Sequence, residues 1–264
     1  MKYRLLCSDL DGTLLTTKDD VSEVTISQIS RIKSSTSIIL VSARMPQSII
    51  YLQKRLDILE EPIICYNGAL ILKGSQEILS VTIPISDIEE IQILAKTYGI
   101  HLGLYYKEEW YVPTTSERVQ KEIRHTRANP IYESTTTTLN HWKKRDIGAH
   151  KIMLMGTKLA MDEVFEKLRL TLNSLQFYRS NDTLIEVAPK AISKHSAILK
   201  VLPPKTSMND VIAFGDNYND IEMLTHASCG VAMGNAREEV KQIANYTTLK
   251  NTEDGVAHFI QEHL

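Results

Sequence analysis

The first 66 residues alternate between short apolar runs and segments with helical periodicity, and this alternation limits the possible folds more than any other feature. Apolar runs occupy residues 5–7, 37–41 and 62–66, and the middle run reads Ser-Ile-Ile-Leu-Val. Between them, 22–33 and 46–56 carry apolar residues at helical spacing. A continuous apolar run indicates a strand covered on both faces. The order therefore predicts a βαβαβ unit with a parallel, doubly wound sheet and right-handed crossovers.

The pattern changes after Asn67-Gly68-Ala69, where strand-like runs come in pairs. The expected pairs are 69–72 with 77–81, 101–106 with 110–113, and 175–179 with 183–187. Helical patterns cover 86–98, 116–128 and 159–172, a further strand is expected at 151–155, and the Thr-rich stretch 134–138 is expected to be a loop. Paired strands of this kind favour a separate antiparallel α+β domain.

The strand–helix alternation returns near residue 190. Strands are expected at 211–214 and 230–233, and helices from 219, over 236–243 and over 253–263. We therefore predict one α/β domain interrupted by an insertion: residues 1–81 and 190–264 form the core and 82–189 the inserted domain. An insertion of roughly 105–110 residues has the size of an ordinary small domain.

Composition excludes several classes of protein. The formal net charge of −2 gives no general attraction to nucleic acid or to an anionic membrane. Cys7, Cys65 and Cys229 lie in or beside apolar runs without a CxxC pair, which indicates reduced thiols and not a disulfide framework or zinc site. No apolar run approaches the ~20 residues of a membrane span, and the N-terminus lacks a signal-peptide pattern. We expect a cytoplasmic protein, monomeric or weakly homo-oligomeric.

Polar residues follow several of the predicted core strands at their carboxyl ends. In open α/β sheets these ends form one rim, and ligands bind there. The segments that meet at this rim are Asp9-Leu10-Asp11, Ser42-Ala43-Arg44, Lys194, and Asp216 with Asn219 and Asp220. Converging carboxylates repel one another unless a cation neutralises them. Oxygen ligands without cysteine or histidine favour a hard cation, and Mg²⁺ is the usual one.

Such a rim suits attack on a phosphate monoester. With the cation bound, Asp9 could attack phosphorus and form an aspartyl-phosphate. Asp11, two residues on, could protonate the leaving alcohol and later activate water. Gly12 permits a sharp turn after the strand, and Thr13 could hold that turn by a hydrogen bond.

These residues resemble the motifs of a known family. Asp9-Leu10-Asp11-Gly12-Thr13 resembles the first motif of the haloacid dehalogenase superfamily, and Ser42, Lys194 and 215–220 resemble the second, third and fourth. The resemblance spans the chain, and the insertion lies where that superfamily places its C2 cap. Asn67-Gly68-Ala69 resembles the Cof-type (IIB) subgroup. The resemblance implies a Rossmann-like core with a C2 cap, and a phosphatase acting on small-molecule phosphate monoesters such as sugar or cofactor phosphates.

The resemblance also implies roles for the four carboxylates. Asp9 corresponds to the nucleophile and a metal ligand. Asp11 corresponds to the acid and base, with its backbone carbonyl on Mg²⁺. Asp216 corresponds to a metal ligand, and Asp220 to a residue that orients metal-bound water or Lys194.

The remaining motif residues are implied to hold the phosphoryl group. They are Ser42, Lys194, Asn219 and the backbone amides of Leu10 and Ala43. Two positions depart from the family pattern, because Ala43 and His195 stand where glycine is usual. Ala43 keeps the amide for phosphate if its φ is negative, and a histidine at 195 could narrow the entrance or touch the substrate.

Three residues near the rim keep open roles. Arg44 could pair with a carboxylate or reach a substrate. Asn67 could form a turn at the domain junction or contact substrate, and the junction role is favoured. His195 is a weaker candidate for substrate contact than Lys194. Cap aromatics and histidines are expected mostly in the core or at the surface, and hinges are expected near 80–84 and 188–191.

Two other functions stay open. A phosphomutase or phosphotransferase would use the same aspartyl-phosphate and pass the phosphoryl group to another acceptor. A non-catalytic protein with this fold could act as a regulator, although a binding role alone does not call for three carboxylates at one rim. Dehalogenation is disfavoured, because a halide leaving group does not need the acid that Asp11 supplies.

Overall fold

The computed structural model describes residues 3–17 and 20–264. The chain divides into two compact units. The core unit comprises Met1–Leu79 and Ser193–Leu264, and the inserted unit comprises Ser80–Ile192. The expected boundaries at 81/82 and 189/190 lie within three residues of these.

The core unit is built on an eight-stranded sheet with the order β14-β13-β12-β1-β2-β3-β4-β5. Its strands are β1 (Leu5–Ser8), β2 (Ser37–Val41), β3 (Ile63–Cys65), β4 (Leu70–Lys73), β5 (Gln76–Ser80), β12 (Val211–Gly215), β13 (Cys229–Ala232) and β14 (Tyr246–Thr247). Every pairing from β14 to β3 is parallel, and β4 returns antiparallel to β3. β1 is central, and its Cys7 lies opposite Ile39 of β2 and Ala213 of β12. This confirms the predicted parallel sheet.

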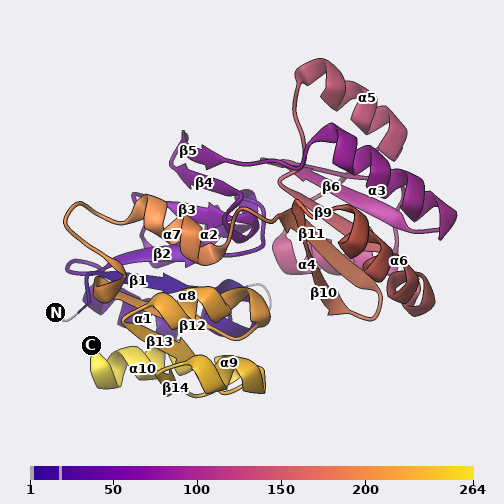
Figure 1. Cartoon of the computed structure of the whole chain (residues 1–264). Helices are drawn as coiled ribbons and strands as arrows, with labels where there is room; N and C mark the ends of the chain where they lie inside the picture. The colour runs from indigo at the N-terminus through magenta and orange to yellow at the C-terminus, as the bar shows by residue number, and fades with distance from the viewer. Residues whose placement is uncertain (1–2, 18–19) are drawn as a thin grey trace. The chain divides into compact units, whose positions relative to one another are not determined.

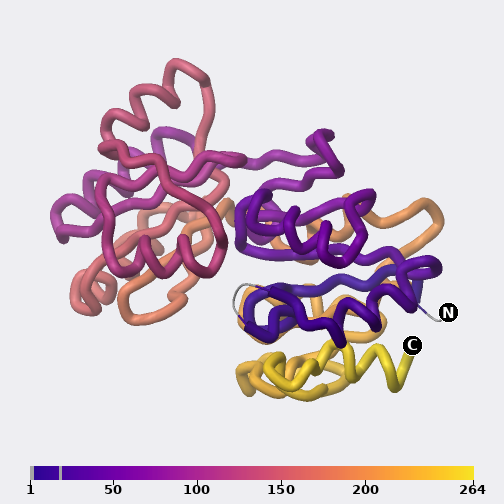
Figure 2. The backbone as a smooth tube through the Cα atoms, turned by 180° about the vertical axis from the view of Figure 1, so that it is seen from behind, coloured from indigo at the N-terminus to yellow at the C-terminus, as the bar shows by residue number. Residues whose placement is uncertain are grey.

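Two groups of helices cover the core sheet, as Figures 1 and 2 show from opposite sides. The core helices are α1 (Glu23–Ile32), α2 (Gln47–Leu56), α7 (Lys194–Val201), α8 (Ile221–His226), α9 (Glu238–Ile243) and α10 (Gly255–His263). α1 contacts α2 and α10, whereas α8 contacts α7 and α9. Strands after β1 run outward in one direction and strands after β12 in the other, so right-handed crossovers place the two groups on opposite faces. The sheet is therefore doubly wound.

The inserted unit has its own six-stranded sheet with the order β10-β11-β9-β6-β7-β8. Its elements are α3 (Ile85–Thr97), β6 (His101–Tyr106), β7 (Glu109–Val112), α4 (Glu117–Thr126), β8 (Ile131–Tyr132), α5 (Thr135–Arg145), β9 (Lys151–Met155), α6 (Lys158–Thr171), β10 (Leu175–Asn181) and β11 (Leu184–Pro189). All its strand pairs are antiparallel except β7 with β8. Apolar residues of α3, α5 and α6 pack with those of β6, β9 and β11 in one core. The expected antiparallel α+β insertion is confirmed.

Residues 134–138 were expected to be a loop, and this prediction is wrong. They form the start of α5, where the Ser134 hydroxyl accepts a hydrogen bond from the backbone N–H of Thr137. Threonine has a low helix propensity, so the run read as irregular. Burial of Leu139 and Trp142 against the rest of the inserted unit stabilises the helix, and tertiary packing commonly outweighs propensity in this way.

The aromatic residues on β6 and β7 pack within the inserted unit. Tyr105 and Trp110 are buried and stack with ring centroids 5.4 Å apart. Tyr106 and Tyr111 lie beside Trp142, with centroids 6.1 Å and 5.8 Å from its ring. These four side chains therefore contribute to packing, as expected for most of them.

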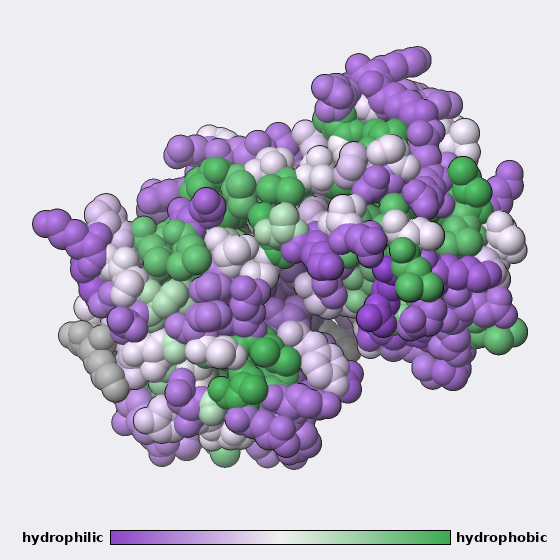
Figure 3. Space-filling view, in the orientation of Figure 1, coloured by the Kyte–Doolittle hydropathy of each residue, from purple (hydrophilic) through white to green (hydrophobic). Residues whose placement is uncertain are grey.

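On the face drawn in Figure 3, hydrophilic residues separate small apolar patches. Within residues 3–17 and 20–264, none of the helices combines the length and apolar character needed to cross a bilayer.

Candidate active site

Asp9 directly follows the central strand β1 and begins a wide helical turn, Leu10–Leu14. The turn is closed by hydrogen bonds from the N–H of Leu14 to the carbonyl of Asp9 (3.3 Å) and from Leu15 to Leu10 (3.0 Å). Such five-residue turns are rare and often occur at functional sites. Inside it, Gly12 has φ +83°, and a Cβ there would lie 2.5 Å from Oδ2 of Asp216. The chain therefore needs glycine at this position.

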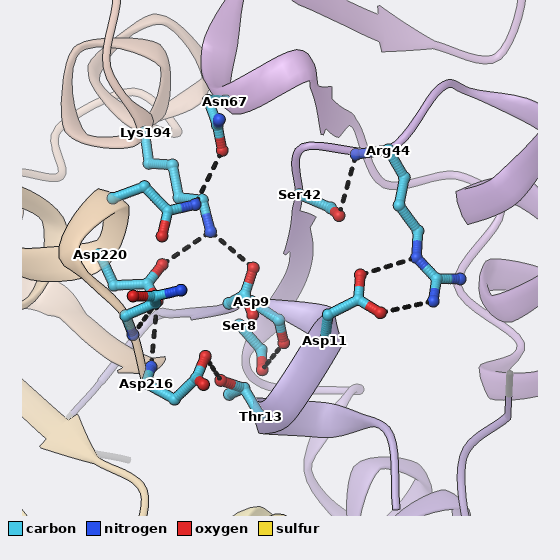
Figure 4. A network of polar contacts seen from close by, with 12 residues as sticks. Ser8, Asp9, Asp11, Thr13, Ser42, Arg44, Asn67, Lys194, Asp216 and Asp220 are labelled. Carbon is cyan, nitrogen blue, oxygen red and sulfur yellow. Dashed lines mark hydrogen bonds and ion pairs between the residues drawn. The ribbon is translucent and has the colours of Figure 1, made fainter. Parts of the chain in front are cut away.

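Lys194 lies at the start of α7 and joins two carboxylates, as Figure 4 shows. Its buried Nζ donates to Oδ1 of Asp9 at 2.5 Å and to Oδ1 of Asp220 at 2.6 Å. Ser193 caps the helix in a reciprocal arrangement with Ser196, which fixes where α7 begins. The lysine thus connects Asp9, 185 residues earlier in the chain, with Asp220, 26 residues later.

Asp220 is fully buried and holds the loop after β12. Its Oδ2 accepts hydrogen bonds from the backbone N–H groups of Asp216 and Asn217, each at 3.0 Å. Gly215 leaves room for this carboxylate, because a Cβ there would lie 2.5 Å from Cβ of Asp220. Asp220 therefore positions both Asp216 and Lys194.

Asp216 directly follows β12 and is hydrogen-bonded to the turn that begins at Asp9. Thr13 Oγ1 donates to Oδ1 of Asp216 at 3.3 Å. The threonine hydroxyl therefore links the segment after β1 to the segment after β12. Ligating oxygens of Asp9, Asp216 and Asp220 all lie within 4.8 Å of one another.

Burial controls the charges of this cluster. It raises the pKa of the Asp9 carboxyl well above its usual value, and the positive charge of Lys194 offsets only part of that rise. Burial and the charge of Asp220 raise the pKa of Asp216 to about 7. Burial opposes the charged form of Lys194 as well, but Asp220 and Asp9 keep its pKa above the usual value. Three carboxylates thus face one ammonium group, and a bound cation would favour their ionised forms.

The donor set fits a hard divalent cation. Asp9, Asp216 and Asp220 offer only carboxylate oxygens, which suit Mg²⁺, Mn²⁺ or Ca²⁺ better than softer metals. Asp220 is the most committed carboxylate of the three, because it already accepts hydrogen bonds from Lys194 and from two backbone N–H groups.

Arg44 forms a bidentate ion pair with Asp11 (Figure 4). Its Nε donates to Oδ2 of Asp11 at 2.8 Å and its Nη2 to Oδ1 at 2.7 Å. The arginine side chain is 3% exposed and the aspartate side chain 48%. Burial opposes the guanidinium charge, but the hydrogen bonds and charge of Asp11 keep the pKa of Arg44 above its usual value. Of the two roles open to Arg44, the structure shows the carboxylate pairing.

The segment after β2 is held by backbone and side-chain contacts. Ser42 is buried, and its hydroxyl accepts the N–H of Arg44 at 3.1 Å. Its carbonyl accepts the N–H of Asn67 at 2.9 Å. Ala43 lies outside the left-handed region of φ, so the alanine at a usual glycine position needs no strained backbone.

Asn67 and Asn219 meet across the rim. Oδ1 of Asn67 accepts from Nδ2 of Asn219 at 3.0 Å, and Asn67 itself has φ +56°. The left-handed backbone agrees with a turn residue, and the side-chain contact also places Asn67 beside the cluster. His195 is directed elsewhere, because its Nδ1 lies 3.2 Å from Oε1 of Glu222 on α8.

Two asparagines that the sequence interpretation did not select also support the site. Asn235 Nδ2 donates to the carbonyl of Gly12 at 2.8 Å, and Asn251 Nδ2 donates to that of Leu15 at 2.8 Å. The N–H of Asn251 in turn donates to Oδ1 of Asn235 at 2.8 Å. Asn235 follows β13 and Asn251 follows β14. Their positions after the carboxyl ends of core strands could have identified them from the sequence.

Comparison with known proteins finds relatives that match this chain over its full length. A family model described as haloacid dehalogenase-like hydrolase matches residues 6–260. A putative phosphatase of Haemophilus influenzae is 34% identical, over 99% of this chain and 98% of the relative. The pyridoxal phosphate phosphatase of Escherichia coli is 30% identical over the full length of both proteins. The crystal structure of a haloacid dehalogenase-like hydrolase from Bacteroides thetaiotaomicron superposes with a TM-score of 0.88, at 29% identity and over all of both chains.

Proposed function

Since this chain belongs to the haloacid dehalogenase-like hydrolases, we propose that it hydrolyses phosphate monoesters of small metabolites with Asp9 as the nucleophile. The observation that carries the proposal is the buried chain of contacts from Asp9 through Lys194 to Asp220 at the end of the central strand. Full-length relatives include a phosphatase that acts on pyridoxal phosphate. This supports a small phosphorylated metabolite, such as a cofactor phosphate, as the substrate.

In the first step, a carboxylate oxygen of Asp9 attacks phosphorus and the bond to the leaving alcohol breaks. Asp11 donates the proton that the alcohol needs. In the second step, water attacks phosphorus of the aspartyl-phosphate while Asp11 takes a proton from it, which restores Asp9 and releases phosphate. In this proposal, the phosphoryl oxygens are held by Lys194, Ser42, Asn219 and the amides of Leu10 and Ala43.

A hard cation, Mg²⁺ in this proposal, would be held by Asp9, Asp216 and the backbone carbonyl of Asp11. It supplies positive charge that offsets the charge of a phosphate dianion. Asp220 keeps Asp216 and Lys194 in place, and Gly12 lets the turn approach Asp216 closely. The residues of this chain thus provide the nucleophile, the acid and the ligands.

The test is phosphate release from an arylphosphate, from pyridoxal phosphate and from a panel of sugar phosphates. We expect release with Mg²⁺, loss of release with excess chelator, and a loss of about 10³-fold or more in kcat for Asp9→Asn. Asp57→Asn is the matched control, because Asp57 is an exposed aspartate paired with Lys33. Hydrolysis in ¹⁸O-labelled water should place one labelled oxygen in each phosphate released. Retained activity in Asp9→Asn, or unlabelled phosphate, would overturn the proposal.

A further inference from the structure

A second cluster of metal-ligating side chains lies on the core unit, apart from the Asp9 site. It consists of His195 on α7 with Glu222 and His226 on α8. Each contributes a nitrogen or oxygen, and the three atoms lie within 4.8 Å of one another. We call these three residues the α7–α8 cluster.

Sequence spacing builds this cluster on two helices in contact. Glu222 and His226 are four residues apart, which places them on one face of α8. His195 lies in the first turn of α7, at the position where the family usually has glycine. The proposed reaction does not use it, and the structure directs it toward α8.

The contacts within the cluster are already close. Nδ1 of His195 lies 3.2 Å from Oε1 of Glu222, and two ligands of one tetrahedral zinc ion are separated by about 3.4 Å. The rings of His195 and His226 are 4.2 Å apart with an angle of 16° between their planes. Nearly parallel rings do not aim their lone pairs at one point, so one ring has to turn for both to bind an ion.

His226 is the ring that can turn. It is exposed, whereas the His195 side chain is only 14% exposed, and the second side-chain torsion of histidine has a broad energy profile. Rotation about that torsion moves the ring nitrogens of His226 without changing the backbone of α8.

Glu222 is held in place by hydrogen bonds from its neighbours. Partial burial opposes its ionisation, but hydrogen bonds from Ser193 and His195 hold the pKa of Glu222 below its usual value. Ser193 also caps α7, so the carboxylate is tied to the start of that helix.

We propose that His195, Glu222 and His226 bind a transition-metal ion of the zinc class that ties α7 to α8. Two imidazoles and one carboxylate suit Zn²⁺ much better than Mg²⁺. A fourth position stays open to water because Glu222 and His226 are exposed. The ion would differ from the cation at Asp9 in chemistry and in place.

The location gives such an ion a consequence for the Asp9 site. α7 begins at Lys194, and α8 follows directly after Asp220. Both residues bind each other through Lys194 Nζ and Asp220 Oδ1. His195 directly follows Lys194, and Glu222 lies two residues after Asp220. A metal ion bound by His195 and Glu222 would therefore restrain the starts of the two helices that carry this pair.

The experiment is Zn²⁺ titration by calorimetry in excess Mg²⁺, done in an Asp216→Asn background so that the Asp9 cluster does not compete. We expect one Zn²⁺ per chain, and a weakening of about tenfold or more for His226→Ala and for His195→Ala. His258→Ala is the matched control, because His258 lies 3.5 Å from a glutamate four residues away, Glu262, and is not part of the α7–α8 cluster. That variant should bind Zn²⁺ as the parent does.

Two further readouts do not depend on activity. Co²⁺ in the same background should give the visible absorption of a tetrahedral site, and His226→Ala should abolish it. At the same concentration, Zn²⁺ should raise the melting temperature of the parent more than that of His226→Ala. Absence of zinc binding, or binding that His226→Ala and His195→Ala leave unaltered, would overturn the proposal.

Discussion

At the scale of single residues, Gly12 meets two separate demands. Its φ of +83° favours glycine, and the space where a Cβ would stand is filled by the Asp216 carboxylate. The first demand concerns the backbone alone, and the second concerns the site. A pair of glycine variants can therefore separate them.

We expect Gly12→Ala to lower the free energy of unfolding by at least about 2 kcal/mol and to impair phosphate release, since Asp216 has to move. Gly99→Ala is the control, because Gly99 has φ +63° and nothing within 4 Å of a new Cβ. That variant should lose only about 1 kcal/mol. Urea denaturation measures the free energy of unfolding of each variant, and kcat measures its phosphate release. Equal losses in the two variants would contradict the steric argument.

Arg44 offers a test of how Asp11 is oriented. Its guanidinium donates hydrogen bonds to both carboxylate oxygens of Asp11. A lysine in its place would keep the positive charge but could not form this bidentate pair. We expect Arg44→Lys to lower kcat about tenfold for an alkyl phosphate, whose leaving group needs an acid. Activity toward p-nitrophenyl phosphate should change little, because that leaving group needs less protonation. Equal loss for both substrates would show that Arg44 does not act through Asp11.

The local sequence points to residues at strand ends, but not to their partners. Asp9, Asp11 and Asp216 stand out because each follows an apolar run at one rim of the sheet. Thr13 binds Asp216 across 203 positions and Arg44 binds Asp11 across 33. Such partners depend on the assembled sheet, so the sequence left the role of Arg44 open.

At the scale of elements, α5 and β7 are joined by an ion pair. Arg145, the last residue of α5, donates from Nη1 to Oε2 of Glu109 at 2.7 Å and from Nη2 to Oε1 at 2.5 Å. The hydrogen bonds from Arg145 lower the pKa of Glu109, against the effect of burial. A carboxyl group with a lowered pKa stabilises the folded state at pH values above its ordinary pKa of about 4.3. That stabilisation is lost as the pH falls through the lowered pKa.

We therefore expect Glu109→Gln to reduce the free energy of unfolding by about 0.5–1 kcal/mol at neutral pH, because the pair is partly solvated. The difference from the parent should shrink below about pH 4 as Glu109 takes up a proton. Denaturant unfolding followed between pH 3 and 7 measures it. A difference that stays constant across this range would contradict the role of the charge.

Elements with a strong apolar pattern could be predicted, and those stabilised by distant contacts could not. β2 was expected at residues 37–41, where the structure has it, because each of its faces is covered. No helix was expected over α5, because its first turn is Thr-rich and its support comes from Trp142 and Leu139. Local sequence does not contain that support.

At the scale of the whole molecule, the inserted unit is continuous in sequence and has its own apolar core. Both tryptophans of the chain, Trp110 and Trp142, are buried in it. Ser80 and Ile83 lie near the first connection to the core unit. Ser80 is hydrogen-bonded to His150 and Ile83 to Ala149, and both partners belong to the inserted unit. A hinge is expected near residues 80–84, and two of these residues are thus hydrogen-bonded within the inserted unit.

We expect residues 80–192 alone to fold cooperatively, because the fragment contains a complete sheet with its covering helices. Tryptophan fluorescence of the fragment should show one sigmoidal urea transition. The same transition should appear in the full chain, where circular dichroism reports both units. A fragment with gradual, non-cooperative fluorescence change would show that the inserted unit needs the core unit to fold.

The position of β1 in the core sheet has a consequence for biosynthesis. β1 lies between β2 and β12, and its register pairs Leu5 with Ser37 on one side and with Val211 on the other. The second partner is about 200 residues later in the chain. During translation, the central strand therefore has one edge open until the whole inserted unit has left the ribosome. An open strand edge invites wrong pairing, so a prior, independent collapse of the inserted unit would shorten the time this nascent chain depends on chaperones.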